Sequence, residues 1–181
     1  MKIWRTEVDS DYKSLGYDNE HHVRQIMSYE RGELPEWRPV YVQVVDEWGS
    51  RHEPMPSFPG LSMHITCNEE IKSILDGLLH KHVDFLPLAS HMIRDEQYYI
   101  LYPKTILDCL DNEQSEFSRF QGYILGVKKY IFKPDCIGNT PIFRLPIAGS
   151  PIGQPYVNDK FKQLVEENNL TGLRFRKVWE G

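Results

Sequence analysis

Apolar residues recur with helical spacing in only two segments of this chain, and that pattern limits the folds it can adopt. In residues 68–80 the apolar side chains lie three or four positions apart and share one helical face. They are Ile71, Ile74, Leu75, Leu78 and Leu79. Residues 159–168 carry a shorter stripe of the same kind, formed by Phe161, Leu164 and Val165. The remaining apolar runs are strand-like, so the sequence predicts an α+β fold with a mainly antiparallel sheet and few helices.

Polar residues suited to helix ends flank both segments. Thr66 and Glu69 have the spacing of a capping box, in which each side chain bonds to the backbone N–H of the other residue. Asn158 is placed to cap the second helix, and Asn168 and Asn169 can end it because Asn tolerates a left-handed backbone. We therefore expect the two helices to span about residues 68–80 and 159–168.

Strands are predicted where short runs of β-branched and aromatic residues lie between Pro, Gly and polar residues. The predicted strands are residues 2–8, 40–45, 84–88, 97–102, 121–132, 141–146 and 173–178, with 121–132 as one long strand or a bent pair. Residues 9–37 are mostly polar, with one candidate strand at residues 23–29. Regular alternation of strands and helices is absent, which argues against a doubly wound fold.

Length and charge exclude several classes of protein. A chain of 181 residues fits a single domain over residues 1–181, with a subdivision near residues 88–96 as the alternative. The net charge is -5, without the basic stripe of a nucleic-acid binder. No apolar run approaches the ~18 residues of a membrane helix, and the first residues lack the apolar core of a secretion signal. We therefore expect a cytoplasmic protein that binds neither nucleic acid nor membranes, with its three cysteines reduced.

Motifs that carry catalytic chemistry are absent from the sequence. It contains no P-loop, no Gly-x-Ser-x-Gly elbow and no His-Glu-x-x-His. His80 and His82 fall at a helix end, where their spacing does not converge on a metal. The sequence therefore predicts no catalytic residue, metal or cofactor. The alternative is a small-molecule enzyme, for which the fold would have to gather His64, His82 or Cys109 into one pocket.

Two sets of residues are candidates for binding a partner protein. The acidic cluster Asp108, Asp111, Glu113 and Glu116 fits either a solvated turn between strands or a partner-binding patch. Trp37 and Trp48 flank a strand among charged residues, and each is either a lid on the core or an anchor in an interface. A third hypothesis is a homo-oligomeric module that associates through the proline-rich residues 53–60.

Short motifs along the chain occur in a familiar order. They are residues 2–5 (KIWR), 85–88 (FLPL), 98–101 (YYIL), 108–111 (DCLD), 142–146 (IFRLP), 156–161 (YVNDKF), 170–175 (LTGLRF) and 178–179 (VW). In this order the chain resembles the bacterial immunity family first defined from a myxobacterial protein. The resemblance covers nearly the whole chain and is weakest at residues 9–60.

The resemblance implies a function in a polymorphic-toxin system. A member of the family would neutralise a cognate toxin, in many cases a nuclease, whose gene lies beside the immunity gene. The shared motifs look like core and turn positions, and they supply no catalytic residues. Against a basic nuclease site, carboxylates such as Asp111, Glu113 and Glu116 could mimic phosphate, whereas Trp37 or Trp48 could hold an exosite.

Overall fold

The structure is a computed structural model of residues 1–181. It describes all of them except residues 31, 34, 35, 47, 48, 50, 53, 92–95, 122 and 147–154 and the side chains of residues 123 and 125. The described residues form three sheets together with four helices. This confirms the predicted α+β class, with sheet as the larger component.

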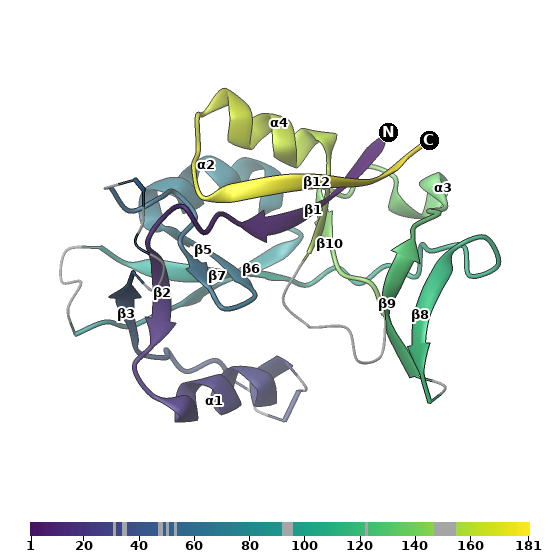
Figure 1. The fold of residues 1–181 in the computed structure, drawn as a ribbon. Helices are drawn as coiled ribbons and strands as arrows, with labels where there is room; N and C mark the ends of the chain where they lie inside the picture. Colours follow the sequence, from purple (N-terminus) through teal and green to yellow (C-terminus); the bar gives the residue numbers. More distant parts are fainter. Residues whose placement is uncertain are drawn as a thin grey trace.

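The first sheet brings the two ends of the chain together. Its order is β10 (Ile142–Phe143), β11 (Tyr156–Asn158), β1 (Lys2–Val8) and β12 (Leu173–Glu180), with every neighbouring pair antiparallel. Figure 1 shows β1 and β12 side by side, with both termini at one end. The helix α4 (Asp159–Glu167) follows β11 directly and contacts both β11 and β1. The C-terminal module is therefore packed on the N-terminal strand.

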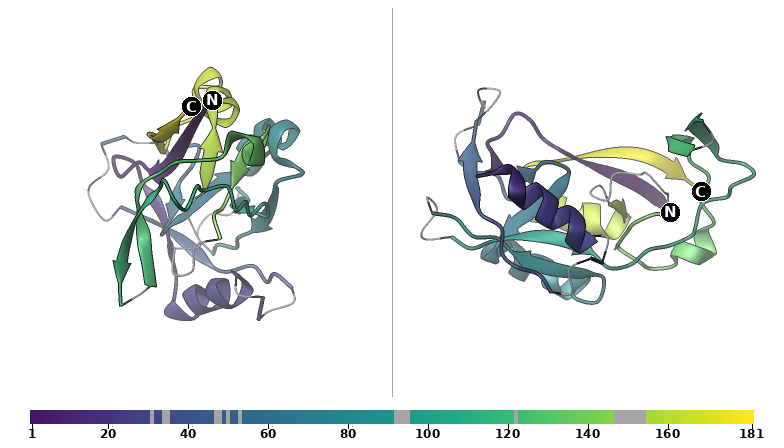
Figure 2. Two further views of the ribbon diagram at one scale, coloured as in Figure 1. Left: turned by 90° about the vertical axis from the view of Figure 1, so that its right-hand side faces the viewer. Right: turned by 90° about the horizontal axis from the view of Figure 1, so that it is seen from below.

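The second sheet contains strands from the first two thirds of the chain. Its order is β3 (Val42–Val45), β2 (Ser14–Tyr17), β4 (Gly60–Leu61), β5 (His64–Asn68), β7 (Tyr98–Pro103) and β6 (Val83–Pro87). β2 and β4 run parallel, and the other neighbours in this sheet are antiparallel. The helix α2 (Glu69–Leu79) contacts β5 and β7. The helix α1 (Glu20–Glu30) lies at the opposite end of the molecule from α4 (Figures 1 and 2).

A two-stranded hairpin stands beside the two larger sheets (Figures 1 and 2). It consists of β8 (Glu116–Phe120) and β9 (Tyr123–Lys129), and the short helix α3 (Pro134–Ile137) follows it. Phe117 and Val127 pack against a buried cluster, whereas Phe120 exposes 61% of its surface. The hairpin is thus held to the body through the part that bears Phe117. Of the two forms predicted for residues 121–132, the single strand is closer, although β9 is shorter.

Buried side chains form three clusters that join the elements. The first cluster links α2 to α4 and includes Leu75, Leu79 and Phe161. The second lies between α1 and the second sheet and includes Leu15 and Ile26. The third lies under the first sheet and α3. The apolar stripes read from the sequence are therefore the faces that α2 and α4 bury.

The starts of α2 and α4 show one wrong and one confirmed prediction. Asn158 caps α4 as expected, since its Oδ1 accepts hydrogen bonds from the backbone N–H groups of Lys160 and Phe161. The predicted cap of α2 is wrong. Thr66 lies inside β5, where its hydroxyl bonds to the carbonyl oxygen of Pro59. Asn68 caps α2 instead, by accepting from the backbone N–H of Ile71 at 3.0 Å.

The candidate strand at residues 23–29 is also wrong, because these residues belong to α1. Ile26 is the buried residue of this helix, and Val23 and Met27 are exposed. A helix that buries so little shows no apolar stripe in its sequence. Asn19 caps it, with Oδ1 accepting from the backbone N–H of His21 at 2.9 Å. An Asn before Glu20 is the available signal in the sequence, and it is a weak one without periodicity.

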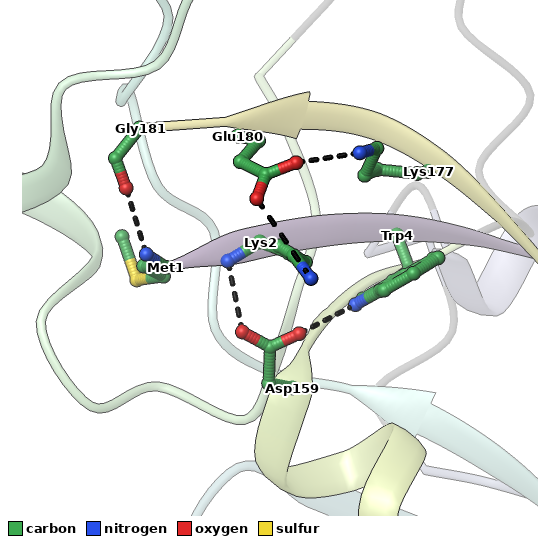
Figure 3. A network of polar contacts seen from close by, with 7 residues as sticks. All are labelled: Met1, Lys2, Trp4, Asp159, Lys177, Glu180 and Gly181. Atoms are coloured by element: carbon green, nitrogen blue, oxygen red, sulfur yellow. Dashed lines mark hydrogen bonds and ion pairs between the residues drawn. The ribbon is translucent and has the colours of Figure 1, made fainter.

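The two chain ends are held together by a polar network (Figure 3). The terminal amine of Met1 donates to the carbonyl oxygen of Gly181 at 2.7 Å. The Asp159 carboxylate, at the start of α4, accepts from the backbone N–H of Lys2 and from the indole N–H of Trp4, both at 2.9 Å. The network therefore ties β1 and α4 to one another close to the point where β12 ends.

We expect Asp159→Asn to lower the free energy of unfolding by about 0.5–1 kcal/mol at neutral pH, because the charge-assisted bonds become neutral ones and solvent screens the exposed carboxylate. Partial burial raises the pKa of the Asp159 carboxyl, but the bonds from Trp4 and Lys2 outweigh it and the pKa lies below its usual value. The stabilisation is thus present above the ordinary carboxyl pKa of about 4 and is lost as pH falls through the lower folded-state pKa.

Urea unfolding at neutral and at acidic pH measures this difference. The exposed Asp135, in the first turn of α3, provides Asp135→Asn as the control, which should leave stability unchanged at both pH values. A difference between native protein and Asp159→Asn that stays constant at all pH values would contradict the role assigned to the carboxylate.

Candidate functional site

The predicted acidic cluster lies on the loop that leads into β8. The Asp111 carboxylate accepts hydrogen bonds from the backbone N–H groups of Gln114 and Glu113, at 3.0 Å each, and from the Gln114 side chain. These bonds, the one from the Gln114 backbone foremost, hold the pKa of the Asp111 carboxyl below its usual value. Glu116 faces Lys129 across the hairpin at 4.0 Å. Asp111 therefore shapes the turn, while Asp108 and Glu113 remain exposed on it.

Trp37 makes its contacts within the protein. It is half-buried, and its indole N–H donates a 2.8 Å hydrogen bond to the carbonyl oxygen of Pro87. Its ring lies edge-on to Tyr29, with 5.2 Å between the ring centroids, and packs against the second buried cluster. This is the setting of a lid on the core. Trp48, the other predicted aromatic candidate, lies outside the described residues.

The three side chains on which the enzyme hypothesis depends, His64, His82 and Cys109, each contact a different part of the protein. His64 Nδ1 lies 3.3 Å from the carbonyl oxygen of Leu61, and its Nε2 lies 3.1 Å from the Glu30 carboxylate. His82 Nδ1 lies 3.3 Å from the Thr105 hydroxyl. Cys109 is buried in the third cluster, where desolvation raises the pKa of its thiol to about 12. None of these contacts links one of the three side chains to another. Among the described residues, no cluster of three or more His, Cys, Asp or Glu could hold a metal.

A pocket of about 820 Å³ lies where β1, β2, β3, β4 and α1 come together. Residues 8–10, 12, 14–20, 23, 43, 45, 60 and 62 line it, and we refer to it as the α1 pocket. Its segments are far apart in sequence, and the parallel pairing of β2 with β4 brings them to one place. Its volume falls within the range of pockets that bind ligands or side chains of a partner.

Small residues on one face of the sheet form the floor of the α1 pocket. The register pairs Ser14 with Val45 and Gly16 with Gln43, so these four residues share the face turned away from Leu15 and the second cluster. A Cβ on Gly16 would lie 2.8 Å from Cγ1 of Val45, and one on Gly60 would lie 2.4 Å from Cγ1 of Val8. The two valines can therefore lie directly against the strands, which leaves a hollow above them.

The walls of the α1 pocket are the loop after β1 and the start of α1. The loop contributes Asp9 and Tyr12, the segment that leads into α1 contributes Asp18, and the helix itself contributes Glu20 and Val23. Tyr12 stacks on His52 with 4.5 Å between ring centroids. The described residues that line the pocket include three carboxylates and no Lys, Arg or His. The pocket therefore has an acidic lining.

A buried contact between a carboxylate and an imidazole fixes α1 in place beside the sheet. The side chains of Glu30, at the end of the helix, and His64, in β5, are only 5% and 11% exposed, with 3.1 Å between carboxylate and imidazole. Nearby, desolvation and the Glu30 charge raise the pKa of Tyr17 to about 12, so this residue stays a neutral phenol at physiological pH. The helix α1 lines the pocket with its first turn, and the contact at Glu30, in its last turn, holds the helix against the sheet.

The described part of the proline-rich segment is covered by its own chain. Pro56, Phe58 and Pro59 are buried, and the backbone N–H of Phe58 donates to the carbonyl oxygen of Thr171 at 3.0 Å. The Thr171 hydroxyl accepts from the backbone N–H of Ser57 at 3.2 Å. These bonds make the segment an internal connection between β4 and β12. Residue 53, the first of the predicted edge, lies outside the described residues.

The described structure is thus an α+β fold with an acidic recess at its surface, built from strand edges and a helix start. In a comparison with protein families, the family model described as "Immunity protein family (Imm11)" matches residues 18–180. The chain belongs to this immunity protein family, which confirms the resemblance drawn from its short motifs. A comparison with curated proteins finds no match. Within the described residues, no helix is both long and apolar enough to cross a membrane.

The α1 pocket is the feature that sequence reasoning missed. Its lining comes from residues 8–23, the least readable part of the chain, together with β3 and β4. The sequence does contain Asp18, Asn19 and Glu20 in a row, but a polar run of that kind is also typical of an ordinary loop. Recognising it requires the helix α1 and the register of β2, neither of which the sequence predicts.

Proposed function

We propose that this chain is an immunity protein that binds a cognate toxin and neutralises it by direct protein–protein contact. The observation that carries the proposal is the family match, which extends over residues 18–180 and so includes α1 and strands of all three sheets. Neutralisation by contact needs a complementary surface rather than a reacting side chain. The separate settings of His64, His82 and Cys109 are consistent with that requirement.

The charge of the molecule supports a partner with a basic contact surface. The chain carries a net charge of -5, and the α1 pocket concentrates carboxylates at one place. A nuclease toxin fits this description, because an enzyme that binds the phosphate backbone carries Lys and Arg in its groove. Opposite charges on the two proteins would also speed their encounter. We therefore propose a nuclease, encoded beside this gene, as the class of toxin.

Co-expression tests the proposal. The product of the adjacent gene is produced in a bacterial host with and without this chain, and growth is scored together with co-purification. We expect growth to be restored and the two proteins to elute as one stoichiometric complex. Absence of both the complex and the rescue would contradict the immunity function.

A second measurement separates binding from chemical detoxification. Toxin released from the purified complex by mild denaturation and refolding should have its original mass and full activity. A covalent change in the released toxin, or one immunity molecule inactivating many toxin molecules, would instead identify this chain as an enzyme.

A further inference from the structure

The carboxylates of the α1 pocket differ in whether the protein itself already neutralises them. Asp9 accepts a 2.6 Å bond from the Arg174 guanidinium, which also reaches Asp11 at 2.9 Å. Asp18 lies 3.0 Å from His22 Nε2 and accepts from the Asn19 side chain at 3.0 Å. Glu20 makes no side-chain hydrogen bond or ion pair with another described residue. The start of α1 therefore carries the charge that remains for a ligand.

Apolar surface at the edge of the pocket complements this charge. Val23, which lines the pocket, exposes 37% of its surface, and Met63, next to the lining residue Ser62, exposes 40%. The side chains of Lys and Arg combine a charged head with an aliphatic stem that packs on such residues. A pocket that offers carboxylates beside exposed Val and Met is therefore suited to a basic side chain more than to a small anion or an apolar group.

The acidic cluster on the loop before β8 is the rival surface, and two of its four carboxylates already have partners within the protein. Asp111 is bonded within its own turn, and Glu116 faces Lys129. Asp108 and Glu113 are exposed on the surface of the loop. Glu20 is exposed as well, but it differs from them in bordering a recess of about 820 Å³, where a side chain from a partner would contact lining residues on more than one side. Complementary charges at such a recess favour one partner over others and speed the encounter with it.

We propose that the α1 pocket is the contact site for the cognate toxin, and that it takes up a Lys or Arg side chain from the toxin surface between Asp18 and Glu20. This inference rests on the proposed function and adds to it the surface and the chemistry of recognition. The rest of the toxin would then lie over α1 and the β4–β5 turn.

Charge reversal at Glu20 tests the inference with a matched control on the same chain. Glu20→Lys changes the first residue of α1, and Glu70→Lys changes an exposed first-turn residue of α2, so both substitutions place a positive charge in the first turn of a helix. A second variant, Ser14→Tyr, fills the pocket from its floor without a change of charge. Thermal unfolding of each variant shows that it is folded before binding is measured.

The probe is the product of the adjacent toxin gene, titrated against the native chain and the variants at low and high salt. We expect Glu20→Lys and Ser14→Tyr to raise the dissociation constant at least about 30-fold, and Glu70→Lys to change it less than about 3-fold. Binding of the native chain should weaken with salt, and binding of Glu20→Lys should depend on salt less.

The outcomes distinguish this inference from the function it rests on. If the native chain binds and rescues growth while Glu20→Lys and Ser14→Tyr bind equally well, the toxin contacts another surface and the inference is wrong, although the immunity function stands. A loss of binding in Glu113→Lys but not in Glu20→Lys would move the contact to the acidic cluster. If the native chain neither binds the toxin nor restores growth, both the proposed function and this inference are wrong.

Discussion

Replacing Phe161 by Ala should lower the free energy of unfolding by about 3–5 kcal/mol, the cost of removing a large side chain from a core that cannot collapse onto the space. Phe161 is 0% exposed and belongs to the cluster that joins α2 to α4. Its ring meets that of Phe175 edge-on, with 6.2 Å between centroids. Because domains of this size are stable by about 5–15 kcal/mol, the loss would remove a large part of the total.

Urea unfolding followed by circular dichroism measures this loss. Phe120→Ala removes the same side chain from an exposed position on the hairpin and should change stability by less than about 0.5 kcal/mol. Phe161→Leu, which leaves a smaller cavity, should fall between the two variants. Equal midpoints for Phe161→Ala and Phe120→Ala would show that the α2–α4 cluster contributes little to stability.

The parts of the fold that the sequence predicts are those in which a buried face leaves a regular pattern. Helices α2 and α4 bury Leu75 and Phe161, and their apolar spacing is therefore visible. The predicted strands at β1, β6 and β7 likewise agree with the structure to within a residue or two. In each case local periodicity and tertiary packing agree.

Prediction fails where an element buries little or is defined by its partner. α1 has Ile26 as its buried residue, and it contains His, Ser, Tyr and Val, which form helices only moderately well. β4 has two residues, and its identity as a strand comes from pairing with β2 and β5. Tertiary contacts decide both structures, and a single sequence does not contain them in readable form.

The candidate site shows the same division. The acidic run before β8 is recognisable because its residues are close in sequence, although Asp111 serves the turn there. The α1 pocket combines the ends of β1 and β4 with the start of α1, and its hollow depends on the register that sets Ser14 opposite Val45. A pocket of this kind depends on how the strands pair. The family motifs indicate the scaffold, but they do not locate the pocket on it.

Gly172 is one such motif residue, and we expect Gly172→Ala to lower the free energy of unfolding by about 2–4 kcal/mol. Its φ is +95°, a backbone conformation that residues with a side chain rarely adopt. A Cβ there would also lie 2.5 Å from the carbonyl oxygen of Phe58, in a segment whose backbone N–H groups at Ser57 and Phe58 are both bonded to Thr171. The carbonyl oxygen of Gly172 accepts from the backbone N–H of Asp9, so the same turn supports a wall of the α1 pocket.

Gly77 supplies a control of opposite sign for this prediction. It lies inside α2, and a methyl group added there would have no described neighbour within 4 Å beyond the helix itself. Gly77→Ala should therefore stabilise the protein by about 0.5–1 kcal/mol through helix propensity alone. Urea unfolding of both variants measures the two effects on one scale. If Gly172→Ala were as stable as the native chain, the turn could relax without cost. That result would show that the close approach of Gly172 to Phe58 does not limit the stability of the protein.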